Sequence, residues 1–333
     1  MKKIILSADI GKYETEVTGR DLELASEDRK TVTFRTKMYD LSEGYIDVEG
    51  NSHLVEINKK SYIIGEQGQD KSEDTSKTQF VHQLACYTAI TQFIEPGTKD
   101  NEIYMVLACP LSVLLIQDAK EEYKEFIKGS GPIKISVDGK EYEFEIKDIM
   151  IKAEGSGIVY LEPTIFTDKT VGIVDLGGLN MGWSLYNNKV CKKDDRFIEE
   201  CGTDKLIDIV REQLAIYKKG NLVNKEIAKK ALDEGGLKKA GEIDVNSVEY
   251  VKKAKALYFE EVLKNIKAHK FDIDQLDRVV FVGGTSQHIK ENITSSLSHA
   301  YIPINSHLST VEGLYKVAFK KYGKNGKNDK SGK

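Results

Sequence analysis

Two short segments of the chain place an aspartate and glycines directly after an apolar run. The first is Asp9-Ile10-Gly11, and the second, about half a chain later, is Asp175-Leu176-Gly177-Gly178. Glycine has no Cβ, so the backbone of such a turn can approach an anion closely and present its N–H groups. A carboxylate beside phosphate oxygens requires a cation, and Mg²⁺ binds one or two carboxylates together with phosphates and waters. Either segment alone is more typical of an ordinary tight turn, but the pair favours two turns that bind the β- and γ-phosphates of a nucleotide.

A third glycine turn follows another buried run. Gly283-Gly284-Thr285-Ser286 comes directly after Arg278–Val282. In isolation it indicates a strand-to-helix turn in which Thr285 or Ser286 caps the helix. Together with the other two turns, it predicts a backbone that passes close to a flat ring or an α-phosphate.

Other nucleotide and hydrolase motifs do not occur. The sequence contains neither Gly-x-x-x-x-Gly-Lys-Ser/Thr nor a Gly-x-Gly-x-x-Gly after a strand, which argues against a P-loop protein and a dinucleotide fold. Glu154-Gly155-Ser156-Gly157 resembles a nucleophile elbow but has the wrong spacing.

Short apolar runs alternate with helical patterns, which indicates an α/β protein. We expect strands, some of them paired in hairpins, at Lys3–Ala8, Thr31–Tyr39, His53–Ile57, Ser61–Ile64, Ile103–Ala108, Ile133–Val137, Glu141–Ile146, Ile149–Lys152, Val171–Val174, Trp183–Tyr186 and Arg278–Val282. We expect helices at Phe80–Ile94, Gln117–Lys128, Thr203–Tyr217, Asn224–Asp233, Val245–Lys267 and Thr310–Lys321, and a polar loop at Asp70–Thr78. Trp183 and Tyr186 are expected in the core.

Composition excludes several classes of protein. The chain has 333 residues, 40% hydrophobic, and a net charge of −4, which fits a globular protein and disfavours one that coats nucleic acid directly. Its four cysteines form no Cys-x-x-Cys pair, so we do not expect a disulfide framework or a zinc site. We expect the protein to occur in a reducing cytoplasm. The most apolar stretch, Met105–Ile116, is too short to span a bilayer, and Asp9 interrupts the amino-terminal apolar run too early for a signal peptide.

The order of these motifs resembles the actin/Hsp70/sugar-kinase ATPase superfamily. Within it, the chain is most similar to the bacterial actin-like ParM plasmid-segregation ATPases, and the resemblance extends from Ile4 to about Tyr322. Its most specific part is Val171–Asn180, and Cys201-Gly202-Thr203-Asp204 resembles the start of a helix in that family. The resemblance implies an actin-like fold, in which two related domains with mixed sheets flanked by helices surround a nucleotide cleft.

The resemblance also implies the extent of each part of the chain. Domain I would comprise residues 1–165 and 310–322, with a small subdomain at 31–78, and domain II would comprise 166–309. The segment 323–333, rich in Lys, Asn and Gly, would be a disordered tail.

Carried onto this sequence, the resemblance assigns roles to particular residues. Glu154 would position the attacking water. Asp9 and Asp175 would hold Mg²⁺ through water, and Asp175 would also be catalytic. The nucleotide would be bound by Asp9, Gly11, Lys12 and Tyr13 in the first phosphate loop, Gly177, Gly178, Leu179 and Asn180 in the second, and Gly283, Gly284 and Thr285 in the adenosine loop.

Two positions depart from the family pattern. Glu16 stands where many relatives carry a lysine that reaches the phosphates, and a carboxylate there would weaken phosphate binding unless it points away. Lys12, inside the turn, could supply the cation as a point charge. Asn180 stands where a threonine is frequent.

The resemblance implies an ATP-dependent protein that assembles head to tail into filaments and segregates plasmid DNA through a DNA-binding adaptor protein, with ATP hydrolysis destabilising the polymer. GTP remains possible as the nucleotide, and direct contact with nucleic acid or membrane is not expected. The main alternative is a small-molecule kinase of the same superfamily, which would need a substrate domain between the motifs. A chaperone or cell-division anchor ranks below it, because neither a peptide-binding domain nor an amphipathic terminal helix follows.

Overall fold

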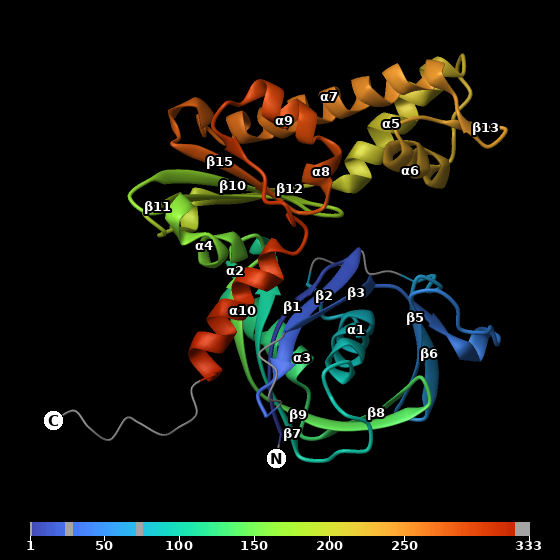
Figure 1. Cartoon of the computed structure of the whole chain (residues 1–333), viewed down its shortest axis with the longest axis vertical. Coiled ribbons are helices and arrows are strands. Elements are labelled where there is room, and N and C mark those ends of the chain that lie inside the picture. The colour runs from blue at the N-terminus through green and yellow to red at the C-terminus, as the bar shows by residue number, and fades with distance from the viewer. Residues whose placement is uncertain (1, 24–28, 71–75, 324–333) are drawn as a thin grey trace. The chain divides into compact units, whose positions relative to one another are not determined.

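The computed structural model describes residues 2–23, 29–70 and 76–323 (Figure 1). The chain divides into two compact units. Unit 1 runs to Glu162 and resumes at Thr310, and unit 2 comprises Pro163–Ser309. The expected boundaries were at 165/166 and 309/310. Residues 71–75 of the expected polar loop, and 324–333 of the expected tail, lie outside the described residues.

Unit 1 contains a nine-stranded sheet in the order β3-β2-β1-β7-β9-β8-β5-β6-β4. Its strands are β1 Lys2–Ile10, β2 Glu14–Asp21, β3 Lys30–Arg35, β4 Met38–Asp40, β5 Ser52–Ile57, β6 Lys60–Gly65, β7 Asn101–Cys109, β8 Ile133–Val137 and β9 Lys140–Ala153. β7 pairs in parallel with both β1 and β9, so Ala8 lies beside Leu107, and Cys109 beside Ala153. The carboxyl ends of these three strands therefore meet at one edge of the sheet.

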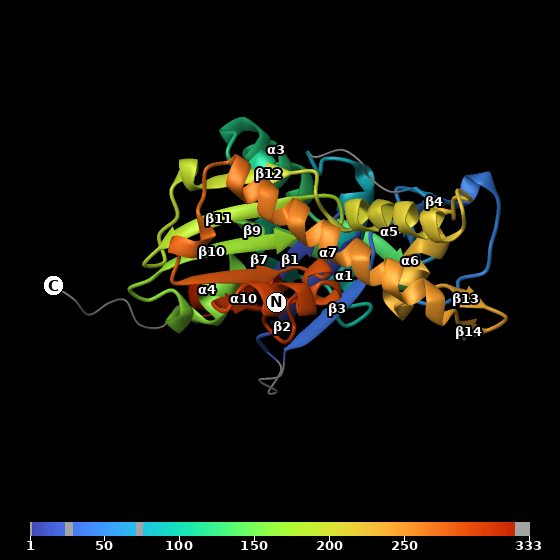
Figure 2. The same ribbon diagram turned by 90° about the horizontal axis from the view of Figure 1, so that it is seen from above.

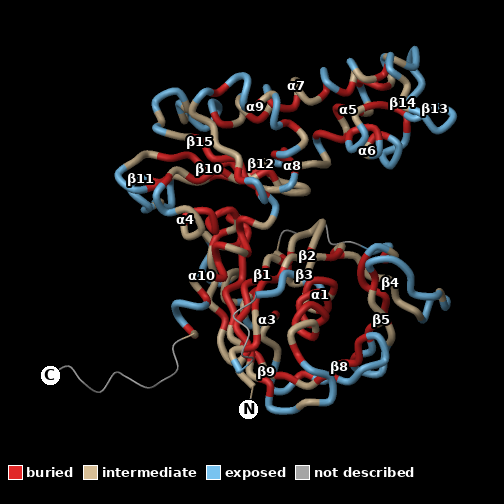
Figure 3. The backbone as a smooth tube through the Cα atoms, viewed as in Figure 1, coloured by how far each residue is buried: buried red, intermediate tan, exposed pale blue. Residues whose placement is uncertain are grey.

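The sheet of unit 1 curves around helix α1, Phe80–Thr91 (Figures 1 and 3). Nearly every side chain of α1 is buried, which is typical of a helix enclosed on all sides. β3 and β4–β6, from the segment expected as a small subdomain, lie at opposite ends of this same sheet.

The remaining helices of unit 1 are α2 Leu111–Leu114, α3 Gln117–Lys128, α4 Gly157–Leu161 and α10 Ser309–Tyr322, with the 3₁₀ turn η1 at Leu41–Glu43. α10 covers the face of the sheet opposite α1, where Leu314 and Ala318 pack with Ile5 and Val106.

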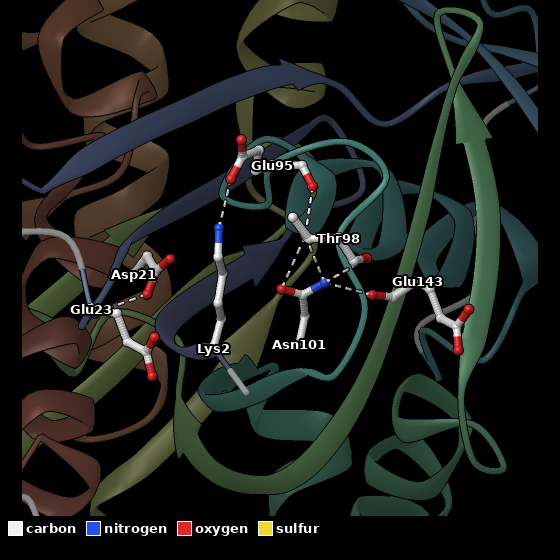
Figure 4. Close-up of polar contacts among 7 residues, drawn as sticks. All are labelled: Lys2, Asp21, Glu23, Glu95, Thr98, Asn101 and Glu143. Atoms are coloured by element: carbon white, nitrogen blue, oxygen red, sulfur yellow. Dashed lines mark hydrogen bonds and ion pairs between the residues drawn. The ribbon is translucent and has the colours of Figure 1, made fainter.

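Polar contacts fix the amino ends of β1 and β7, away from the edge where the strand ends meet (Figure 4). Lys2 Nζ donates to Glu95 Oε2 at 2.8 Å. The buried Asn101 side chain donates to the backbone oxygens of Thr98 at 3.1 Å and Glu143 at 2.8 Å. These bonds tie β7 to β9 at their beginning.

Unit 2 contains a five-stranded sheet in the order β12-β11-β10-β15-β16 and a separate small hairpin, β13–β14. Its strands are β10 Thr170–Leu176, β11 Met181–Asn187, β12 Arg196–Glu199, β13 Lys238–Lys239, β14 Glu242–Ile243, β15 Arg278–Val282 and β16 Ala300–Tyr301. Its helices are α5 Thr203–Tyr217, α6 Lys225–Glu234, α7 Val245–Ala268, α8 Thr285–His288 and α9 Lys290–Ser296, with 3₁₀ turns η2 Pro163–Ile165, η3 Lys193–Asp195 and η4 Ile273–Gln275.

The core of unit 2 lies between the sheet and its helices. The fully buried Trp183 of β11 packs against Phe197 of β12, with ring centroids 6.1 Å apart. α5, α6 and the amino end of α7 gather beside the β13–β14 hairpin (Figure 2). The prediction that Trp183 and Tyr186 are core residues is confirmed.

Three expected strands differ from the structure. Glu141–Ile146 and Ile149–Lys152 form the single long strand β9, because a register irregularity at Ile103/Tyr104 lets pairing with β7 continue. The strand expected at Thr31–Tyr39 is divided, because Arg35 pairs with Glu14 of β2, whereas Met38 pairs with Ile64 of β6.

Cys86, Cys109, Cys191 and Cys201 are all free thiols. Within the part of the chain that the structure describes, no helix is both long and apolar enough to cross a membrane.

Candidate nucleotide-binding site

The first predicted phosphate loop is the tight turn between β1 and β2. Ile10 pairs with Thr15, which leaves Gly11, Lys12, Tyr13 and Glu14 in the turn. A Cβ on Gly11 would lie 2.5 Å from the backbone oxygen of Glu14, so the turn requires glycine here.

Arg35 of β3 fixes the end of this turn. Its guanidinium lies over the Tyr13 ring, 3.4 Å from the centroid, and its Nε donates to the Tyr13 backbone oxygen at 3.0 Å. Thr36 donates its backbone N–H to the same oxygen at 3.1 Å. The loop is therefore held by a neighbouring strand before any ligand binds.

Asp9 and Glu154 both lie at the edge where the parallel strands of unit 1 end. Asp9 belongs to β1, and Glu154 follows β9 and donates its N–H to the Cys109 oxygen at 2.9 Å. The buried Oδ1 of Asp9 has no hydrogen bond among the described residues. Burial raises the pKa of Asp9 to about 6, although the nearby ammonium of Lys77 acts in the opposite direction. The Oδ1 of Asp9 lies at ion-pair distance, 3.6 Å, from Lys77 Nζ, and the Asp9 side chain as a whole is 19% exposed.

Lys77 is the residue of this edge that sequence reasoning missed. It precedes α1, its residue is only 2% exposed, and its Nζ contacts Glu154 and lies 3.6 Å from Asp9 Oδ1. Burial lowers the pKa of a lysine, but Glu154 and Asp9 outweigh burial and hold the pKa of Lys77 above its usual value. Lys77 is therefore a buried, protonated lysine paired with two carboxylates.

The second predicted phosphate loop is the turn between β10 and β11 in unit 2. Leu176 pairs with Met181, so Gly177, Gly178, Leu179 and Asn180 form the turn. The Gly177 N–H donates to the Asn180 oxygen at 3.0 Å and closes the turn. This loop has the same position after its strand as the β1–β2 turn has in unit 1.

The amino end of α5 is hydrogen-bonded to this second loop. The backbone N–H groups of Gly202, Thr203 and Asp204 donate to the oxygens of Leu179, Gly177 and Gly178 at 2.9–3.0 Å. A Cβ on Gly202 would lie 2.5 Å from the Leu179 backbone carbon, so only glycine permits this approach. The first amides of α5 are thus bonded to the loop, and the N–H groups of Gly178, Leu179 and Asn180 are the candidates for phosphate binding.

The third glycine turn packs against the second loop. Gly283 has φ +84°, and a Cβ there would lie 2.3 Å from the Leu176 oxygen and 2.9 Å from Asp175 Oδ1. Thr285 bonds the Thr203 hydroxyl at 2.5 Å and the Gly177 oxygen at 3.3 Å. The structure therefore brings Asp175 and its loop together with the Gly283–Thr285 turn.

Ser306, which sequence reasoning missed, holds the third turn in place. Its backbone oxygen accepts from the Gly283 N–H at 3.1 Å, and its hydroxyl donates to the Gly283 oxygen at 3.1 Å. Ser286 donates to the same oxygen at 2.7 Å. No pattern in the sequence around Ser306 indicates this contact, because it joins segments more than 20 residues apart.

Within unit 1, the structure brings Asp9, Gly11, Lys12, Tyr13 and Glu154 to one edge. Within unit 2 it gathers the other candidates, which are Asp175, Gly177, Gly178, Leu179, Asn180, Gly283, Gly284 and Thr285. Glu16 of β2 lies directly opposite Asp9 in the antiparallel pair, so the two side chains lie on the same face of the sheet.

The donor set fits Mg²⁺ bound to a nucleotide better than a metal held by protein alone. In the described ranges no three His, Cys, Asp or Glu side chains converge on a common point. A single, partly exposed carboxylate such as Asp9 matches an ion that takes its remaining ligands from phosphates and water.

The comparisons with known proteins agree with this arrangement. The model of the actin-like protein N-terminal domain matches residues 7–157. The solved structure of the Alp12 filament is 48% identical in sequence, covers 97% of this chain and all of its own, and superposes with a TM-score of 0.71.

The chain belongs to the actin-like protein family.

More distant actin-like proteins share the fold. An archaeal actin homologue, Ta0583, is 15% identical over 96% of this chain and all of its own, with a TM-score of 0.76. The 15-stranded ParM filament from Clostridium botulinum is also 15% identical, over 96% of this chain and 99% of its own, with a TM-score of 0.73. No curated protein matches the sequence significantly. The actin-like fold expected from the motif order, with mixed sheets flanked by helices, is thus confirmed.

Proposed function

We propose that this actin-like protein binds ATP, assembles into filaments and segregates plasmid DNA through an adaptor, with ATP hydrolysis destabilising the polymer. The observation that carries the proposal is the 48% identity, over nearly the whole chain, to a protein whose structure is that of a filament. The two Asp-x-Gly turns support nucleotide binding. A complex of the archaeal actin homologue with ADP supports it at the level of the fold.

In this proposal each turn contributes to phosphate binding. Backbone N–H groups of Gly11–Tyr13 and of Gly178–Asn180 bind the phosphates, and Lys12 adds a positive charge. Mg²⁺, held through water by Asp9 and Asp175, neutralises the phosphate oxygens. The Gly283–Thr285 turn receives the adenosine, and GTP is the other nucleotide to be tested.

Glu154 is the candidate that acts on the attacking water. Its carboxylate is one-quarter exposed and lies at the same strand-end edge as Asp9. In the proposed reaction it accepts a hydrogen bond from the water and aligns it with the γ-phosphorus. The contribution of the chain is thus mainly positioning and charge stabilisation.

The proposed partners are further copies of the chain and an adaptor. Head-to-tail contacts that do not close into a ring produce open filaments. Several similar solved structures are of ParM proteins, one of them a filament. With a net charge of −4, the chain is poorly suited to bind DNA directly, so an adaptor would connect it to DNA in the cytoplasm.

Sedimentation tests the proposal. Micromolar protein is centrifuged at high speed with Mg²⁺ and ATP, ADP or no nucleotide, and the pellet is inspected by electron microscopy. We expect filaments in the pellet with ATP and their loss in Asp175→Ala. Asp194→Ala, an exposed aspartate of η3, is the matched control and should pellet like the wild type. Undiminished assembly of Asp175→Ala would contradict the proposal that Asp175 holds Mg²⁺ for assembly. Absence of filaments from the wild type would contradict the proposed assembly itself.

A further inference from the structure

Lys77 is a buried cation to which the proposed reaction gives no task. Its side chain is 3% exposed, whereas those of its partners Asp9 and Glu154 are 19% and 25% exposed. The two carboxylate side chains are therefore partly exposed, and the ammonium lies on their covered side. A buried lysine is costly unless it is paired, so this arrangement restricts where both partners can lie.

The charge around Lys77 explains why a cation is needed there. Glu16, Asp9 and Glu154 place three carboxylates near the turn that is proposed to bind phosphates. Like charges repel one another, and phosphate oxygens would be repelled by all three. Lys12 lies in the turn itself. Lys77 adds a second positive charge on the buried side of Asp9 and Glu154.

The contact with Glu154 is the more specific of the two. Lys77 Nζ donates a hydrogen bond to Glu154 Oε1, whereas its separation of 3.6 Å from Asp9 Oδ1 exceeds hydrogen-bond distance. The backbone of Glu154 is fixed by the bond to Cys109, and that of the next residue by a bond from Gly155 N–H to the Thr310 hydroxyl at 3.3 Å. With its backbone held, the direction of the Glu154 side chain is set by Lys77.

We propose that Lys77 is the positioning residue of Glu154, holding its carboxylate in the direction needed to align the attacking water and offsetting the negative charge at this edge. The inference rests on the proposed function. Lys77 acts through Glu154 and does not itself contact the reacting atoms. Its location before α1 shows that the cation is supplied by a different element from the β1–β2 hairpin.

A double-mutant cycle separates this role from a purely structural ion pair. Phosphate release is measured for the wild type, Lys77→Met, Glu154→Gln and the double variant, with ATP affinity and the unfolding temperature measured alongside. We expect Lys77→Met to slow phosphate release by about 10- to 100-fold, as a misplaced catalytic group does. In the Glu154→Gln background, Lys77→Met should alter the rate by less than about twofold, because the carboxylate that Lys77 positions is already absent.

Two further variants complete the test. Lys77→Arg keeps the charge but moves the donor, so its rate should lie between those of the wild type and Lys77→Met. It replaces Lys77→Met in the cycle if the latter does not fold. Lys147→Met removes a lysine that pairs with Glu102 and Glu145 at a distance from the site, and should leave the rate unchanged.

The outcomes distinguish the two proposals. If Lys77→Met slows release by the same factor in both backgrounds, or does not slow it at all while the wild type is active, the positioning role is wrong. If the wild type neither binds ATP nor releases phosphate, the proposed function fails and the role of Lys77 fails with it.

Discussion

Replacing Gly283 with alanine should destabilise unit 2 more than replacing its neighbour Gly284. Gly283 has φ +84°, a conformation that costs an L-residue roughly 1–2 kcal/mol. The new Cβ would also lie 2.3 Å from the Leu176 backbone oxygen, which cannot move without distorting β10. Overpacking of this kind costs about 1–3 kcal/mol, so we expect a total loss of about 2–5 kcal/mol.

Gly284→Ala is the matched control. Gly284 has φ −63°, and a Cβ there meets no described atom within 4 Å. Its effect on the free energy of unfolding should stay within about 1 kcal/mol, because a small capping loss is offset by reduced freedom of the unfolded chain.

Urea unfolding followed by tryptophan fluorescence measures both variants. Trp183 is the only tryptophan of the sequence and is fully buried in unit 2, so its emission reports on this unit separately from unit 1. At a urea dependence of about 2 kcal/mol per molar, Gly283→Ala should lower the midpoint by about 1–2.5 M. Equal midpoints for the two variants would refute the close packing of the third turn against β10.

Three further predictions concern the site and unit 2. Glu154→Ala should slow phosphate release more than it slows assembly. An unchanged release rate would mean that Glu154 is a solvated surface carboxylate without a role in hydrolysis. Thr285→Val removes the hydrogen bonds to Thr203 and to the second loop, so we expect the free energy of unfolding, measured with urea, to fall by about 1 kcal/mol. ATP binding, measured by fluorescence titration, should also weaken, and an unaltered ATP affinity would mean that this turn does not bind the nucleotide. Burial holds the pKa of His288 below its usual value despite the nearby Asp233, so folding disfavours its protonation and stability should fall as pH drops below about 6.5. His288→Gln should weaken that dependence between pH 7 and about 5.5, as read from Trp183, and parallel curves for the two proteins would contradict it.

Elements with strong local signals are the ones that the sequence predicts accurately. α3 and α5 have the predicted bounds, Gln117–Lys128 and Thr203–Tyr217, because their apolar residues recur at helical spacing. β15 has its predicted bounds, Arg278–Val282, since a short apolar run ends at a glycine pair. These signals depend only on neighbouring residues.

Contacts between distant segments explain what the sequence could not predict. The continuity of β9 depends on its pairing with β7, which no local pattern encodes. Lys77 is one charged residue in a polar segment, and its burial becomes evident only when the strand ends carrying Asp9 and Glu154 are placed beside it. Ser306 likewise acquires its role through the fold of unit 2.

Simultaneous right-angle light scattering and phosphate release, after ATP and Mg²⁺ are added to micromolar protein, tests the central claim most directly. A nucleotide-driven filament predicts a rise in scattering that decays as phosphate accumulates. GTP is tested in parallel, and ADP serves as the control that should give no rise. Phosphate release without scattering at any protein concentration would contradict autonomous assembly, and absence of both signals with either triphosphate would contradict the account as a whole.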